Sequence, residues 1–207
     1  TMKKLLLILL CLPIIGFGQI KEINSDKELL VFDDKEMYNS TKVYYDSKNY
    51  KDKLIFFNDN QRVFINISRV IEFGELYEKG MNKSIEWYEV AKKNDVKELE
   101  KDMDWTFKTD GGILYNGVSF YYSAPFEGFF KVRITLDGYS TGPNYRFRVM
   151  QKDENEIHSE FVDIGLNIVS RDGDLKKAKM LINFCKNYEK YVNEAIDKFN
   201  SKDNLFK

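Results

Sequence analysis

The chain has few of the residues on which many enzyme active sites depend. It contains one histidine, His158, and two cysteines, Cys11 and Cys185. A histidine-based metal site or a catalytic triad needs further partners, which a lone histidine does not supply. Cys185 lies on the apolar stripe of a predicted helix, where a cysteine acts as a small buried hydrophobe and not as a nucleophile. We therefore expect no catalytic residue, no metal site and no cofactor.

Other absences argue against further classes of protein. The chain has three prolines and a formal net charge of −1, and it shows no Ser/Pro/Gly-rich linker or internal repeat. A nucleic-acid-binding protein usually carries a strong basic excess, so no nucleic-acid partner is expected. Asp110-Gly111-Gly112 is typical of a turn and not of a phosphate-binding glycine loop. Asp172 and Asp174 lack the spaced oxygen ligands of a calcium loop.

At its start the chain has the pattern of a secretory signal peptide over residues 2–18. Two lysines precede an apolar run from Leu5 to Ile15, and small glycines follow before Gln19. The run is shorter than the roughly 20 residues of a membrane-spanning helix, so no transmembrane segment is expected. A lipid anchor on Cys11 is disfavoured, because two leucines and not a small residue precede it. We expect a protein exported to the periplasm or beyond the cell.

Cleavage before Gln19 would leave residues 19–207, which we expect to form a single domain. This length falls at the upper end of one ordinary domain. With Cys11 removed, only Cys185 would remain, so no intramolecular disulfide could form. The fold must then depend on its core, and an aromatic content of 15% supplies large side chains for one.

The first half of the chain predicts strands followed by a helix. Four short apolar runs, bounded by Asp, Asn or Lys clusters, predict strands joined by polar turns; they cover 29–32, 43–45, 54–57 and 63–65. Apolar residues then recur at spacings of three and four from about Arg69 to Lys93, with Ser68 as the expected N-cap. Gly74 and Gly80 inside this pattern each cost about 1 kcal/mol relative to Ala, and indicate either a close contact or a break.

The second half predicts further strands and a final helix. The extended runs cover 113–122, 130–136, 145–150, 157–162 and 166–169. Asn116-Gly117 is an alternative turn within the first of them. A helix is predicted from about Gly173 to Phe199, with Asp172 as N-cap. Strands in runs and helices in runs favour an α+β fold, with a meander-like antiparallel sheet packed against two long amphipathic helices.

One group of side chains is a candidate binding site. If strands 130–136 and 145–150 form a hairpin, its non-core face carries Lys131, Arg133, Arg146 and Arg148. Half of the chain's six arginines are in this group, and arginine suits bidentate recognition of carboxylate or phosphate. The face would then bind an anionic ligand or protein partner. Alternatively, acids on neighbouring strands, such as Glu127 or Glu160, balance it.

These patterns favour an exported, non-enzymatic binding or interaction protein whose ligand the sequence does not identify. The alternative is a hydrolase that acts on an envelope or polymer substrate through paired carboxylates. That function needs two acids that converge in a pocket, one of them with a raised pKa. A structural subunit of an envelope assembly would instead show a large exposed apolar patch.

Overall fold

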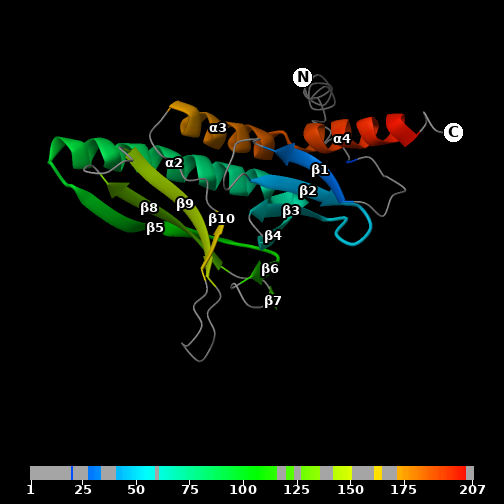
Figure 1. Ribbon diagram of the computed structural model, residues 1–207, viewed down its shortest axis with the longest axis horizontal. Helices are drawn as coiled ribbons and strands as arrows, with labels where there is room; N and C mark the ends of the chain where they lie inside the picture. Colours follow the sequence, from blue (N-terminus) through cyan, green and yellow to red (C-terminus); the bar gives the residue numbers. More distant parts are fainter. Residues whose placement is uncertain are drawn as a thin grey trace, which may run out of the picture.

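The computed structural model describes Ile20 and residues 28–33, 41–58, 61–115, 120–123, 127–135, 142–150, 161–164 and 172–203. These residues form two antiparallel sheets and three α-helices, in which the helices lie along one side of the sheets (Figure 1). For β7, β9 and β10, and for most of β6 and β8, the description is of the backbone. The expected α+β class is confirmed.

The first sheet begins with a four-strand meander. Its strands, each antiparallel to the next, are β1 (Glu28–Asp33), β2 (Lys42–Asp46), β3 (Lys53–Asn58) and β4 (Gln61–Asn66). Two further strands extend the sheet beyond β4, namely β6 (Gly112–Tyr115) and β7 (Phe120–Ser123). The antiparallel pairing of β6 with β7 shows that the run predicted over 113–122 contains two strands and not one, while the alternative turn at Asn116-Gly117 lies outside the described residues.

The second sheet has the strand order β10-β9-β8-β5. Its members are β5 (Glu98–Lys108), β8 (Glu127–Thr135), β9 (Gly142–Met150) and β10 (Phe161–Ile164). The edge strand β5 is absent from the sequence-based predictions, since Glu and Asp have low strand propensity. Leu99, Met103, Trp105 and Phe107 nevertheless alternate with its charged residues. The strand predicted at 166–169 lies outside the described residues.

The described helices are one long helix and two shorter ones, instead of the two long helices that were predicted. They are α2 (Val70–Lys93), α3 (Asp172–Lys186) and α4 (Tyr188–Asp203), and a short 3₁₀ helix, η1 (Ile67–Arg69), precedes α2. Asn187 interrupts the predicted final helix: its side-chain Nδ2 donates to the Asn183 carbonyl at 2.9 Å, which also accepts the Asn187 backbone N–H. Such side-chain bonds compete with the helical ladder.

The start of α2 also differs from the prediction. Asn66, and not Ser68, supplies the capping side chain: its Oδ1 accepts the Ser68 backbone N–H at 3.0 Å and so caps η1. The helix then runs without a break through Gly74 and Gly80 to Lys93. None of the described helices combines the length and the apolar character that crossing a membrane requires.

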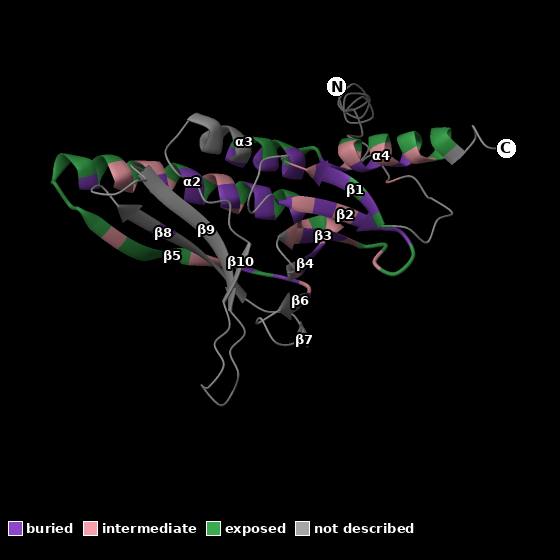
Figure 2. Ribbon diagram, viewed as in Figure 1, coloured by how far each residue is buried: buried purple, intermediate pink, exposed green. Residues whose placement is uncertain are grey.

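The core gathers where the helices meet both sheets. The Phe73 ring of α2 lies 5.4 Å from the Phe56 ring of β3 and 5.2 Å from the Phe107 ring of β5. Phe184 of α3 adds contacts to Phe56 and to Phe32 of β1. Figure 2 shows buried residues along the faces of α2 and α3 that meet the sheets, and exposed residues on their outer faces. At the edge of this core, Lys79 of α2, which contacts Trp105 of β5, is exposed.

Candidate functional site

The predicted basic face lies on the hairpin of β8 and β9, which the structure confirms as a backbone pairing. The register places Lys131 directly opposite Arg146 and keeps Arg133 and Arg148 in the same alternation. Val132, between two of these residues, is fully buried. Because alternate residues point to opposite faces of a sheet, the register agrees with a basic face turned away from the core. The four side chains lie outside the described residues, so their binding role stays a prediction.

Acidic residues of the neighbouring strands stand beside this basic face. The register of β5 with β8 sets Asp102 opposite Lys131 and Glu100 opposite Arg133, and β10 brings Asp163 next to β9. Opposite charges directly across from each other on adjacent strands attract. The backbone register therefore favours the flanking-acid explanation of these cations, although the acids differ from those that the sequence suggested.

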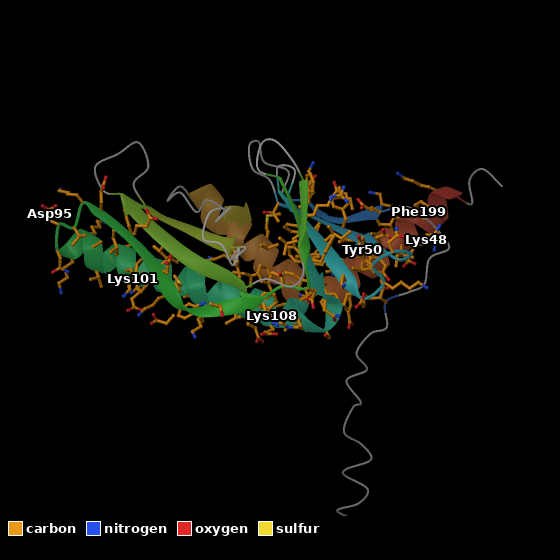
Figure 3. All side chains as sticks on the ribbon, turned by 90° about the horizontal axis from the view of Figure 1, so that it is seen from below. Lys48, Tyr50, Asp95, Lys101, Lys108 and Phe199 are labelled. Carbon is orange, nitrogen blue, oxygen red and sulfur yellow. The ribbon has the colours of Figure 1, made fainter. Side chains whose placement is uncertain are left out.

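A second row of cations, with described side chains, runs along the boundary between α2 and β5. In this α2–β5 seam each cation stands over an aromatic ring. The Arg69 Cζ lies 4.4 Å from the Phe107 ring centroid, the Lys79 Nζ 4.1 Å from that of Trp105, and the Lys101 and Lys83 Nζ atoms 4.7 Å and 5.9 Å from that of Trp87. Figure 3 labels Lys101 and Lys108 on the β5 side of this boundary. These are cation–π contacts, in which the ring's negative face attracts the positive group.

The chain reversal after α2 places these residues side by side. Asp95 adopts a φ of 53°, and the Val96 N–H donates to the Ala91 carbonyl at 2.9 Å, which ends the helix in a tight turn. β5 then returns along α2, so residues late in the helix lie beside residues early in the strand. At the far end Arg69 also donates from Nη1 to the Lys108 carbonyl, which holds the strand against the start of the helix.

The cations of the seam fall into two classes. The Arg69 Nε lies 3.0 Å from the Glu72 carboxylate, and the Lys83 Nζ lies 2.6 Å from that of Glu86. The hydrogen bond to Glu72 raises the pKa of Arg69 above its ordinary value. Lys79 and Lys101, which are exposed, contact rings and have no carboxylate partner among the described residues.

The chain has two tryptophans, and both lie in the seam. Trp87 and Trp105 are half-buried, with the rings packed against the hydrophobic core. The Trp105 Nε1 is buried and has no hydrogen-bond partner within the described part of the chain. A buried donor without a partner costs about 1–3 kcal/mol. In a native fold such a donor is satisfied by an ordered water or by an acceptor that a ligand brings.

Among the described residues, the reactive side chains of Cys185 and Tyr188 belong to the buried core. Cys185 is fully buried, as expected, and burial raises the pKa of its thiol, which keeps it protonated and unreactive at neutral pH. Burial, with a smaller effect of Glu189, raises the pKa of Tyr188 to about 12. Over the residues that the structure describes, no group of three His, Cys, Asp or Glu side chains is placed to hold a metal ion. His158 lies outside those residues.

Asp46 illustrates a structural role for a carboxylate. Its side chain accepts the backbone N–H groups of Lys48 and Asn49, each at 2.9 Å, and the Asn49 side-chain amide at 2.8 Å. Burial alone would raise the pKa of this carboxyl, but these hydrogen bonds outweigh it and the pKa is lowered. The carboxylate stabilises the turn after β2.

The seam is the site that sequence reasoning missed. One signal could have found it. Every second residue from Leu99 to Phe107 is apolar except Lys101, and both tryptophans of the chain lie in or near this stretch. The chain matches no protein-family model, no curated protein and no solved structure. An assignment of function therefore depends on the chemistry of the seam.

Proposed function

We propose that the protein is an exported, non-enzymatic binding protein that holds an anionic ligand on the α2–β5 seam. The observation that carries this proposal is the placement of Lys79 and Lys101 over the two tryptophan rings without a carboxylate partner among the described residues. A ring orders the ammonium group but leaves its charge available. A ligand carboxylate, sulfate or phosphate then meets a cation whose charge no carboxylate among the described residues compensates.

The local charge of the seam supports an anionic ligand. Its four cations, Arg69, Lys79, Lys83 and Lys101, face three carboxylates, which leaves an excess of one positive charge. The carboxylates are those of Glu72, Glu86 and Asp110. The whole chain has a formal net charge of −1. A positive region on a nearly neutral protein attracts anions to that region and not to the surface at large.

The chemistry of the seam also supports binding without catalysis. It offers ammonium groups that stabilise bound anions and aromatic faces that pack against a ligand, and Glu72 and Glu86 are engaged in ion pairs. The signal-peptide pattern of residues 2–18 supports export, so the ligand would be one found in the periplasm or outside the cell.

The test compares two double variants with the same change of charge. Lys79→Gln with Lys101→Gln alters the seam, and Lys179→Gln with Lys198→Gln alters exposed lysines on α3 and α4. The probes are polygalacturonate, polyglutamate and phosphatidylglycerol vesicles, measured at low and high salt. We expect wild type and the control to bind at least one probe, and the seam variant to bind it about tenfold or more weakly, a loss of about 1.4 kcal/mol.

Three results would overturn the proposal. The first is that no probe binds to wild type. The second is equal binding of the probe by the seam variant and the control. If a variant with Arg133→Gln and Arg148→Gln then loses binding, the ligand site is the basic face of β8 and β9. The third is the release of new reducing ends from polygalacturonate, which would establish the hydrolase alternative.

A further inference from the structure

We infer that the anionic ligand of the α2–β5 seam is an acidic polysaccharide, with sugar rings stacked on Trp105 and Trp87 and carboxylates paired with Lys79 and Lys101. This inference rests on the proposed function and adds the chemical class of the ligand. It combines three observations on the described side chains, which are the two indole faces, the cation beside each face, and the unpartnered indole N–H of Trp105.

The indole faces are covered by side chains that are easily displaced. Lys79 stands over Trp105 and Lys101 over Trp87, and both lysines are exposed. A cation–π contact at an exposed site is weak, and the lysine stem rotates freely. The C–H bonds of a pyranose ring carry partial positive charge and pack on the negative face of an aromatic ring. A sugar can therefore take the place of the ammonium group over the ring, while the ammonium group moves onto the sugar's carboxylate.

The unpartnered donor of Trp105 fits the same ligand. Its Nε1 is buried and has no hydrogen-bond partner in the described part of the chain. The indole N–H lies in the plane of the ring, so an acceptor must reach it at the ring edge, and the hydroxyl oxygens of a sugar stacked on the face extend toward that edge. A simple inorganic anion would use the lysine but would leave the aromatic face without a partner.

The spacing of the two tryptophan platforms favours a polymer. Lys79 stands over the Trp105 ring, so its position on α2 gives the position of that ring along the helix. Trp87 follows Lys79 by eight residues on α2, which corresponds to roughly 12 Å along the helix. This span is longer than one pyranose ring, so a single sugar contacts one platform only. An oligosaccharide that reaches both gains from the high effective concentration of its second sugar.

The surface around the rings disfavours a membrane or a protein partner. Lys79 and Lys101 are exposed over the two half-buried tryptophan rings, and Glu72 and Glu86 are exposed beside the other cations of the seam. Aromatic residues that anchor proteins to membranes instead present their rings to the lipid headgroups. The core of a protein interface is depleted of such charged side chains.

Tryptophan fluorescence tests the inference directly, because both tryptophans of the chain lie in the seam. The full chain after leader removal is titrated with polygalacturonate, with its fully methyl-esterified form, with polyglutamate, with phosphatidylglycerol vesicles and with the monosaccharide galacturonate. We expect polygalacturonate to change the emission and to bind at least tenfold more tightly than each of the other probes. The single-tryptophan variants Trp87→Phe and Trp105→Phe should each retain part of the emission change. Trp105→Phe should also weaken binding, because it removes the N–H donor but keeps an aromatic ring.

The outcomes separate this inference from the proposed function. If polyglutamate or the vesicles bind as tightly as polygalacturonate and Lys79→Gln weakens that binding, the anion-binding function stands and the polysaccharide inference is wrong. If the methyl ester binds as tightly as the acid, the required carboxylate is disproved. If no anion binds wild type, both fail. The wild-type titrations need no substitution, so a folding defect in Trp105→Phe would leave the result decisive.

Discussion

A lysine over an indole ring carries a charge that no acid compensates, whereas the charge of a lysine in an ion pair is compensated by the carboxylate. The α2–β5 seam contains both kinds, since Lys83 pairs with Glu86 while Lys79 and Lys101 contact tryptophan rings. Because no carboxylate among the described residues compensates their charge, Lys79 and Lys101 are the residues whose replacement should weaken anion binding most. Replacement by glutamine removes the charge and leaves most of the stem that covers the ring.

Gly74 is the residue that allows α2 and α3 to approach. A Cβ atom built on Gly74 would lie 2.5 Å from the Cβ of Cys185. The Cα and Cβ atoms of Cys185 are fixed to the backbone of α3, so they cannot move aside as the end of a long, flexible side chain can. The glycine that weakens the helix pattern in the sequence therefore marks a close contact between helices and not a break.

We predict that Gly74→Ala destabilises the protein by about 1–3 kcal/mol, the range for overpacking a core. Urea unfolding followed by circular dichroism measures the change. The matched control is Glu75→Ala, the next residue on the exposed face of α2, which should change stability by less than about 0.5 kcal/mol. Cys185→Gly should partly rescue Gly74→Ala, because it removes the Cβ that the new methyl group meets. Full additivity of the two losses would contradict the contact.

At the scale of elements, β5 connects the two charged surfaces of the molecule. One side of the strand faces α2 and supplies Lys101 and Trp105 to the seam. Residues of the opposite alternation, Glu100 and Asp102, stand opposite Arg133 and Lys131 of β8 in the sheet register. The strand thus completes a cation–aromatic surface on one side and brings acids to the predicted basic face on the other.

This register leads to a prediction for Arg133→Gln with Arg148→Gln. Opposite charges across neighbouring strands contribute roughly 0.2–1 kcal/mol per pair, so the double variant should lose a few tenths to about 1 kcal/mol of stability. The loss should shrink at high salt, and thermal unfolding at both salt concentrations measures it. Unchanged or increased stability, together with weakened binding of an anion, would instead show that the basic face of β8 and β9 is the ligand site.

At the scale of the whole molecule, the helices and both sheets share one cluster of buried residues. Phe73 is central, because its ring contacts Phe56 in the first sheet and Phe107 in the second. The Phe107 ring also carries the Arg69 guanidinium on its surface side. The shared core and the seam are therefore connected through the same strand.

The proposed export makes a prediction about the mature protein. Protein recovered from its native host should begin at Gln19, within two residues, because the cleavage motif directly precedes that position. Mass spectrometry of the intact protein measures the terminus. A Leu9→Arg variant, which interrupts the apolar run, should accumulate with residues 2–18 attached. An intact Met2 in the wild-type protein, or a lipid on Cys11, would contradict export as described.

The elements could be predicted from the sequence wherever a local pattern determines them. The strands of the meander follow from short runs such as Leu54 to Phe57, and α2 follows from an apolar stripe at helical spacing. Cys185 was correctly expected to be buried, since it lies on the apolar stripe of its helix. Two predictions were wrong because hydrophobic periodicity does not show how asparagine side chains bond to the nearby backbone. The predicted final helix is interrupted at Asn187, whose side chain bonds to the Asn183 carbonyl, and Asn66 instead of Ser68 supplies the capping side chain.

The sequence by itself therefore determined the α+β class, the position of most strands and helices, and the burial of Cys185, because those features depend on neighbours within one or two turns. Tertiary structure alone decided the placement of Lys79 over Trp105, of Glu100 opposite Arg133, and of Gly74 against Cys185. Each of these contacts joins residues far apart in the chain. They depend on the path of β5 along α2, its register with β8 and the packing of α3 on α2, none of which a local pattern specifies.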